Sequence, residues 1–215
     1  LDPNVPPGVS QLEGSTQLVG IKGTLVRDRT DSRWTPSTGD RIRVSYEQVV
    51  GDWTFGRAFA EYRRYYPVYV DAFDRKHVLA GRVSVGHIFG DAPVFERFYG
   101  GGTGSIRGFR YRGIGPRAAP PFDNDPVGGD FEVLAGAEYN FPIVTEQLRG
   151  VIFLDTGTVE RDFEITTYRA SIGAGLRWVV PILGPVPMSL DFGIPISKDE
   201  DDETQLVSFT FGWTL

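Results

Sequence analysis

Cysteine is absent from this sequence of 215 residues, so a disulfide framework is excluded. An apolar run of about 18 residues, the length that a transmembrane helix needs, is also missing. The nearest stretch, 178–190, carries no charge but is interrupted by Pro181, Pro185 and Pro187. The first residues lack the basic start and apolar run of a signal peptide. We therefore expect no transmembrane helix, and either a presequence has been removed or the chain is a piece of something longer.

Histidine is nearly absent as well, since it occurs only at His77 and His87. Neither histidine belongs to a metal-ligand or nucleophile motif, so we expect no enzyme, no catalytic residue, no metal and no cofactor. The formal net charge of −6 argues against general nucleic-acid binding. A charged fraction of 23% beside 40% hydrophobic residues argues against wholesale disorder.

Glycine, in contrast, is abundant: the chain has 27 glycines, which are costly in helix interiors and disfavour a mostly helical domain. Apolar residues alternate with polar or small ones in segment after segment, which is the pattern of half-buried strands. In 131–141, for example, the odd positions are all apolar or aromatic, and the even positions include Glu132, Gly136 and Glu138. The alternation predicts nine strands, at residues 16–27, 39–50, 53–66, 76–90, 129–141, 147–158, 167–180, 186–196 and 204–215.

Two architectures fit these strands: a soluble barrel or sandwich with its apolar face inward, and a membrane barrel with that face toward lipid. The polar face mixes glycine and serine with sparse Arg, Glu and Asp, which is typical of a crowded lumen. The predicted strands are also longer than the ~5–6 residues usual in soluble sheets. Aromatic residues near strand ends suit an interfacial girdle. We therefore predict an all-β, antiparallel transmembrane β-barrel region over 16–215.

The longest connection, 91–128, carries the densest chemistry. Residues 97–117 contain five arginines, seven glycines and no acid. The glycines do not form a phosphate-binding loop, because no Gly-Lys-Ser/Thr ending follows them. Surface binding of phosphate or polysaccharide is an alternative, and tight turns alone would explain the glycines but not the arginines. We favour a loop folded back into the barrel, among inward carboxylates at Glu132, Glu138, Asp155 and Asp191.

Several motifs then support a resemblance. The sequence has ERFYGGG at 96–102, SIRGF at 105–109, GIGP at 113–116, DRTD at 28–31, GAEY at 136–139, FLDTG at 153–157 and GAGLR at 173–177. Together these resemble the C-terminal barrel region of the BamA/TamA outer-membrane assembly family, also called the bacterial surface antigen family. The resemblance covers about residues 15–215 and does not separate BamA-like, TamA-like and secretion-partner members.

The resemblance implies that the long loop enters the lumen and that its motif Ile106, Arg107, Gly108 and Phe109 meets the next strands. The expected contacts of Arg107 are Glu138, Phe153 and Asp155. If the hairpin between them turns near residue 144, the two carboxylates differ in height by roughly 13 Å. We therefore expect Asp155 to be the main partner and one guanidinium not to reach both. Arg107 either braces the barrel or takes part in a functional cycle.

Family members end in an aromatic residue that serves as an assembly signal. Here the last strand keeps aromatic spacing at Phe209, Phe211 and Trp213 but ends at Leu215. In this family the C-terminus is periplasmic, which implies that the loop 91–128 is outside and that residues 1–15, before the nine predicted strands, are an extracellular loop or linker. Because bacterial barrels normally have an even number of strands, we expect this chain to be the C-terminal part of a sixteen-strand barrel.

By resemblance, the function is insertion, assembly or translocation of outer-membrane proteins, by an integral protein of the bacterial outer membrane. The expected partners are the lipid bilayer, unfolded outer-membrane protein clients, and accessory assembly proteins or the missing N-terminal part of the barrel. No nucleic acid is expected. The alternative is a passive pore or structural barrel without insertase activity, and a soluble ligand-carrying barrel ranks third.

Overall fold

The computed structural model describes residues 16–118, 124–179 and 187–211. Over these residues the chain is almost entirely β-structure, with one 3-10 turn at Val94–Glu96. No helix in the described ranges is long and apolar enough to cross a membrane. The strands are β1 (Leu18–Asp28), β2 (Gly39–Gly51), β3 (Phe55–Val70), β4 (Lys76–Gly90), β5 (Gly108–Phe109), β6 (Phe131–Pro142), β7 (Leu148–Glu160), β8 (Arg169–Val179), β9 (Pro187–Ser197), β10 (Thr204–Gln205) and β11 (Val207–Phe211).

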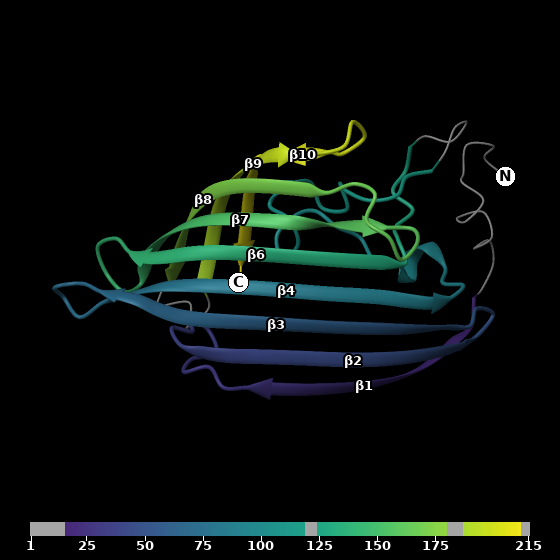
Figure 1. Cartoon of the computed structure of the whole chain (residues 1–215), viewed down its shortest axis with the longest axis horizontal. Helices are drawn as coiled ribbons and strands as arrows, with labels where there is room; N and C mark the ends of the chain where they lie inside the picture. The colour runs from purple at the N-terminus through teal and green to yellow at the C-terminus, as the bar shows by residue number, and fades with distance from the viewer. Residues whose placement is uncertain (1–15, 119–123, 180–186, 212–215) are drawn as a thin grey trace.

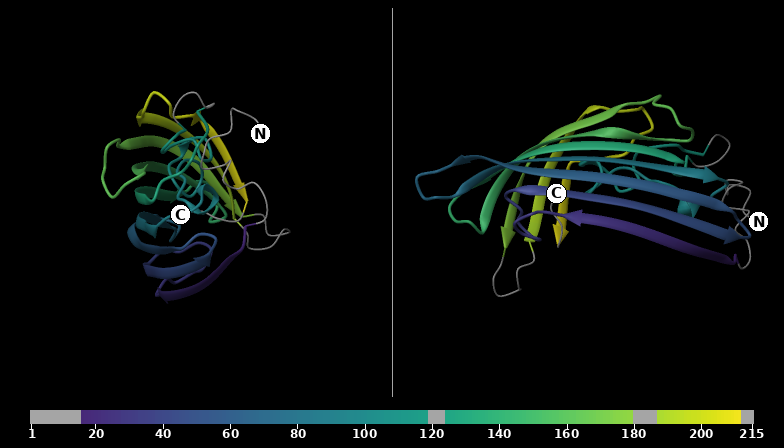
Figure 2. Two further views of the ribbon diagram at one scale, coloured as in Figure 1. Left: turned by 90° about the vertical axis from the view of Figure 1, so that its right-hand side faces the viewer. Right: turned by 60° about the horizontal axis from the view of Figure 1, so that its bottom comes forward.

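Nine of these strands form one antiparallel sheet in the order β1-β2-β3-β4-β6-β7-β8-β9-β11 (Figure 1). The two short strands, β5 and β10, pair with each other instead. The sheet is strongly curved, and the segment between β4 and β6 lies on its concave side (Figure 2). The predicted all-β, antiparallel fold of nine strands is confirmed. We call the concave face the inner face and the convex face the outer face.

Alternation along each strand produces these two faces, because successive side chains of a strand point to opposite sides. On β7, Ile152 and Leu154 are 51% and 45% exposed, whereas their neighbours Phe153 and Asp155 are 2% and 1% exposed. Cross-strand register carries the two faces from strand to strand, with register shifts between Pro67 and Tyr69 and between Ala170 and Ser171. An apolar face of this extent is not stable against water, so it faces lipid.

Two histidines on strand β4 mark the two limits of the apolar band on the outer face. Near one end, His77 packs against the rings of Tyr69, Tyr139 and Phe141. Near the other end, His87 packs against Phe89, Phe131 and Phe163. Ten residues of strand separate the two histidines, which is about 33 Å along the strand and about 25 Å across the membrane at the usual tilt. The two aromatic clusters therefore lie where the girdles of a membrane barrel belong.

The last strand differs from the prediction of one continuous strand over 204–215. Thr204–Gln205 pairs with β5, and only Val207–Phe211 pairs with β9 among the described residues. The Gly193 N–H still donates to the Leu206 carbonyl at 2.8 Å. The next β9 residue aimed at this edge is Pro195, which has no N–H to offer. The chain therefore leaves the wall at Leu206 and turns toward the inner face. Residues 1–15, Trp213 and Leu215 lie outside the described ranges.

The orientation of the faces predicts opposite effects for charge at two adjacent positions near the middle of β1. Leu25 is on the outer face and Thr24 on the inner face, and both are exposed. Leu25→Arg is expected to cost about 2–4 kcal/mol of folding free energy in a bilayer, and Thr24→Arg much less. Denaturant titration of both variants in vesicles measures the difference. An equal or larger loss for Thr24→Arg would contradict the assigned faces.

Candidate functional site

The segment between β4 and β6 folds back on itself as a compact loop. Isolated β-bridges join Phe98 to Gly129 and Gly100 to Ile114. Directly after Gly100, Gly101 and Gly102 have φ of 99° and 81°, a conformation that other residues rarely adopt. A Cβ on Gly101 would also collide with the Arg110 carbonyl oxygen. The glycines thus allow the tight turns that deliver residues 106–109 to the inner face of the sheet.

Apolar residues then anchor the loop. Ile106 and Phe109 are both 0% exposed, and they form a core cluster with Ile114 and with Leu134 of β6. Gly108, which lies between the two anchors, has φ of 91° and approaches β9 closely. A Cβ on Gly193 of β9 would lie 2.6 Å from the Gly108 nitrogen. The glycine at each side of this contact lets the loop main chain lie directly against the wall.

Arg107 is the charged centre of the site, and it is 4% exposed. Its Nε and Nη2 donate to the two carboxylate oxygens of Asp155, at 2.7 and 3.0 Å. Its main-chain N–H donates to the same Asp155 carboxylate at 3.1 Å. Nη1 donates to Glu138 at 2.8 Å and lies 3.6 Å from an Asp191 oxygen. We call Arg107, Glu138, Asp155, Asp191 and the adjacent Arg177 the Arg107 cluster.

The expectation that one guanidinium cannot reach both Glu138 and Asp155 is wrong. It assumed a hairpin turn near residue 144, which places the carboxylates far apart. In the structure Glu138 lies opposite Phe153, and Asp155 lies opposite Gly136. The two carboxylates are therefore only two residues apart along the sheet, about 7 Å. Asp155 does accept more hydrogen bonds from Arg107 than Glu138 does.

The ring of Phe153 packs against the flat face of the Arg107 guanidinium. Its ring centroid is 3.5 Å from the Arg107 Cζ, which is a cation–π contact in a site shielded from water. Phe153 lies opposite Gly173 of β8, and a Cβ on Gly173 would collide with the ring. The glycine in the GAGLR motif therefore makes room for the aromatic platform. Arg107 therefore contacts all three residues that the resemblance predicts: Glu138, Phe153 and Asp155.

Other members of the site were not identified from the sequence as partners of the loop. Arg177 of β8 donates to Glu138 at 3.1 Å and to Asp191 of β9 at 2.8 Å, so the two arginines alternate with the carboxylates. Arg82 of β4, 5% exposed, donates to the carbonyls of Gly104 and Ser105 at 2.6 and 2.7 Å. Both arginines sit at inward positions of their strands, which was the only available signal.

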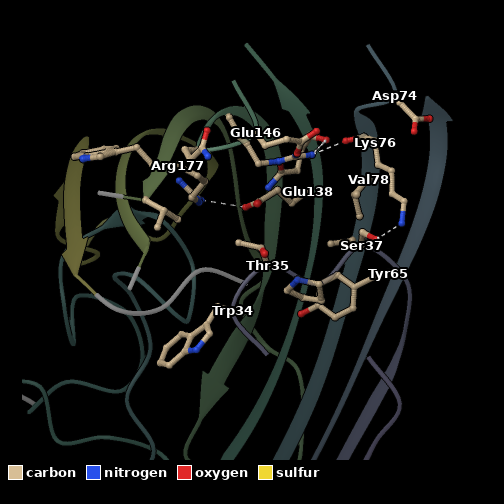
Figure 3. Close-up of a pocket in the computed structure, with 17 residues that line it drawn as sticks. Trp34, Thr35, Ser37, Tyr65, Asp74, Lys76, Val78, Glu138, Glu146 and Arg177 are labelled. Atoms are coloured by element: carbon tan, nitrogen blue, oxygen red, sulfur yellow. Dashed lines mark hydrogen bonds and ion pairs between the residues drawn. The ribbon is translucent and has the colours of Figure 1, made fainter. Parts of the chain in front are cut away.

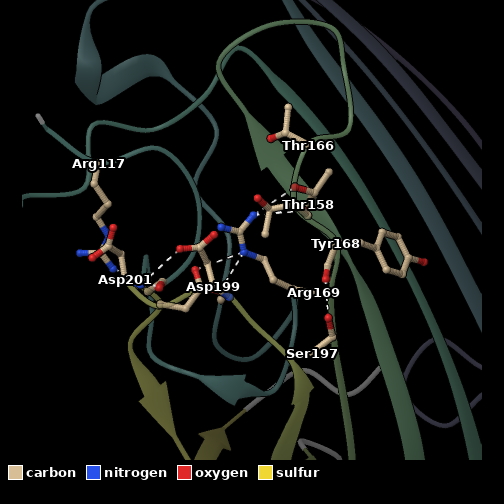
Figure 4. Close-up of polar contacts among 12 residues, drawn as sticks. Arg117, Thr158, Thr166, Tyr168, Arg169, Ser197, Asp199 and Asp201 are labelled. Atoms are coloured by element: carbon tan, nitrogen blue, oxygen red, sulfur yellow. Dashed lines mark hydrogen bonds and ion pairs between the residues drawn. The ribbon is translucent and has the colours of Figure 1, made fainter.

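A second set of contacts joins the loop to the hairpin before the last strand. Arg110 and Arg117 donate to the two carboxylate oxygens of Glu203 at 2.6 and 2.9 Å. The Arg110 N–H also donates to the Glu203 carbonyl at 2.9 Å, in line with the β5–β10 pairing. Next to it, Arg169 of β8 binds Asp202 through Nε at 2.9 Å (Figure 4). The loop therefore contacts residues just before the terminal strand β11 as well as the inner face of the sheet.

A cavity of about 480 Å³ lies on the other side of the Arg107 cluster. Glu138 and Arg177 line it from the sheet, Tyr65 from β3, and Trp34 and Thr35 from the turn between β1 and β2 (Figure 3). Charged groups of both signs and aromatic rings share its lining. Over the residues described, no three His, Asp or Glu side chains are grouped so that they could hold a metal ion.

The cluster predicts that Arg107 keeps the loop against the wall. Arg107→Ala leaves buried carboxylates without their shared cation, and breaking a buried ion pair costs about 3–5 kcal/mol. We expect cleavage of residues 97–117 by a non-specific protease to rise sharply in this variant. Arg110→Ala is the control, because an exposed ion pair contributes only about 0–1 kcal/mol. Equal cleavage in the two variants would show that the cluster does not hold the loop.

The Glu203 contacts predict a dependence on pH. Hydrogen bonds from Arg110 and then Arg117 hold the pKa of Glu203 below its ordinary value of 4.5. The stabilisation is therefore fully present above that ordinary pKa, and it is lost as pH falls through the lowered value. Glu203→Gln should lower Tm at neutral pH, and the difference from wild type should shrink in acid. Glu200→Gln, at an exposed position of the same loop, should show no such pH-dependent difference.

Comparison with known proteins agrees with this fold. The model of the Omp85 superfamily domain matches residues 6–215. The outer membrane protein assembly factor BamA of Nitratidesulfovibrio vulgaris is 32% identical over 98% of the chain, and that of Neorickettsia risticii is 27% identical over 96%. The chain spans only 27% and 28% of these two proteins.

Among solved structures, BamA from Haemophilus ducreyi lacking POTRA domains 1–3 matches with a TM-score of 0.78. The match covers 90% of this chain and 42% of that one, at 21% sequence identity, so it shows the fold. The family match over nearly the whole length carries the assignment: this chain belongs to the Omp85 superfamily.

Proposed function

We propose that this chain is the barrel region of an outer-membrane protein assembly factor whose clients are unfolded outer-membrane proteins. The chain is part of an integral outer-membrane protein, as its family and its apolar outer face indicate. The names of the BamA relatives support the activity. Because the chain spans about a quarter of those proteins, the activity belongs to the full-length protein, in which further strands pair with the edge of β1 and complete the predicted sixteen.

The observation that carries the proposal is the connection of the terminal strand to the loop. A strand entering hydrocarbon must pair its main-chain groups, because lipid offers no hydrogen bonds. A free sheet edge supplies such partners by strand addition. In the described residues β11 pairs with β9 over Val207–Phe211, and above Leu206 the chain is held by the loop instead. The N-terminal end of the terminal strand is thus held by the loop and not by β9.

The proposed role of the Arg107 cluster follows from this arrangement. While Arg107 is bound to Asp155 and Glu138, the loop holds residues 203–205 on the inner side and fixes the upper end of the terminal strand. The edge of β11 then stays in one position and offers a regular row of main-chain groups to a client strand. Displacement of the loop would free that end to move. Arg107 in this scheme is a positioning residue that acts through β5 and β10.

We further propose that the assembly step involves no covalent chemistry and no cofactor. Hydrogen-bond exchange between a sheet edge and a client strand needs no nucleophile or metal. The inner-face groups of the cluster are guanidinium and carboxylate pairs that bind one another, and they suit positioning.

Reconstitution tests the proposal. Full-length protein in phospholipid vesicles should fold an added, urea-unfolded outer-membrane barrel protein, as read from its heat-dependent gel mobility. Arg107→Ala should slow that folding roughly tenfold or more, because the loop no longer fixes the strand. Arg43→Gln, at an exposed inward position remote from the cluster, is the control. Ion conductance without any client folding by the wild-type protein would favour the passive pore instead.

A further inference from the structure

The outer face of the sheet is uncharged except at one place. Cross-strand register fixes which side chains share this face. Within the described strands its charged residues are Arg27 of β1, Asp40 of β2 and Arg64 of β3. Glu160 does not belong to this set, because it follows the distorted backbone at Gly157 and is buried. Charges that are absent from the rest of this large face are thus gathered at a single point.

The three side chains contact one another. The Arg27 Nη2 lies 2.5 Å from one Asp40 oxygen, and the Arg64 Nη1 lies 3.5 Å from the other. The Asp40 side chain is 9% exposed, whereas those of Arg27 and Arg64 are 50% and 35% exposed. Two cations therefore share one carboxylate, which leaves a net positive charge. Each guanidinium has five N–H donors, so donors remain that face outward.

The cluster lies toward one end of the sheet. Arg27 is near the end of β1 and Asp40 near the start of β2, so both adjoin the turn at 29–38. This turn lies at the same end of the sheet as His77 and its aromatic cluster, the left side of Figure 1. The Arg64 Cζ is 4.3 Å from the ring centroid of Tyr66, which also faces outward. An aromatic ring beside a cation is typical of the headgroup level.

We propose that Arg27, Asp40 and Arg64 form a binding site for the phosphate of an anionic phospholipid. An uncompensated cation is costly at the lipid surface of a protein, and a phosphate supplies the missing negative charge. Guanidinium groups bind phosphate oxygens through paired hydrogen bonds. Asp40 holds the two arginines side by side, and the acyl chains of the same lipid lie along the apolar outer face. This site is independent of the proposed assembly activity.

Native mass spectrometry of the full-length protein tests the site, with phosphatidylglycerol and phosphatidylcholine added separately in detergent. Wild-type protein should retain one phosphatidylglycerol more strongly than phosphatidylcholine. Arg64→Gln should weaken that retention roughly tenfold, and the double variant with Arg27→Gln further. Asp40→Asn should strengthen it, because both guanidinium groups become available. Arg43→Gln, an exposed arginine on the opposite face of β2, should leave it unchanged.

The outcomes separate the alternatives. Heat-dependent gel mobility verifies that each variant is folded. In addition, Asp40→Asn is expected to increase lipid retention, and a damaged protein would not produce an increase. Displacement of phosphatidylglycerol by millimolar inorganic phosphate would identify a simple anion site and overturn the lipid assignment. Equal retention by wild type and the double arginine variant would overturn the site itself. Client folding is not part of this measurement, so failure of the assembly proposal would not alter its result.

Discussion

One buried guanidinium constrains the whole inner face. Removing a cation from water is costly unless carboxylates surround it in good geometry, and Arg107 obtains them from β6, β7 and β9. Those three strands must therefore keep a register that brings Glu138, Asp155 and Asp191 to one height. The same requirement explains why small residues line that height. A Cβ on Gly136 would lie 2.9 Å from an Asp155 oxygen, and a Cβ on Gly173 would displace Phe153.

The sequence was sufficient for the strands and their faces because both follow from local alternation. It was sufficient also for the identity of the central arginine, through the resemblance of the loop motif. It was not sufficient for cross-strand distances, since a shift of the hairpin centre by one or two residues changes them by several ångströms. The contacts of Arg82 with loop carbonyls left no signal beyond its inward position, because a carbonyl acceptor requires no particular residue type. The separation of β10 from β11 depended on Pro195, a single residue in the neighbouring strand.

The two faces obey opposite rules for charge. On the inner face, arginines and carboxylates bind one another, so that Arg107 contacts three acids and Arg177 contacts two. On the outer face, the charged residues of the described strands are confined to one cluster toward one end of the sheet. The described sheet thus has several ion pairs on its inner face and one small cluster of charges on its outer face. The inner network holds protein to protein, and the outer one faces the bilayer.

The sequence separations within the loop contacts have a consequence for the order of folding. Arg107 and Asp155 are 48 residues apart, and Arg110 and Glu203 are 93 residues apart. Such distant contacts require large loops to close, as does the pairing of β4 with β6, whereas the other hairpins of the sheet join strands that follow each other closely along the chain. The carboxylates that receive Arg107 come from β6, β7 and β9, so the docked loop needs all three strands in place. Its attachment to Glu203 also needs the segment that follows β9, so the complete set of loop contacts exists only when the chain from β4 to β10 is assembled.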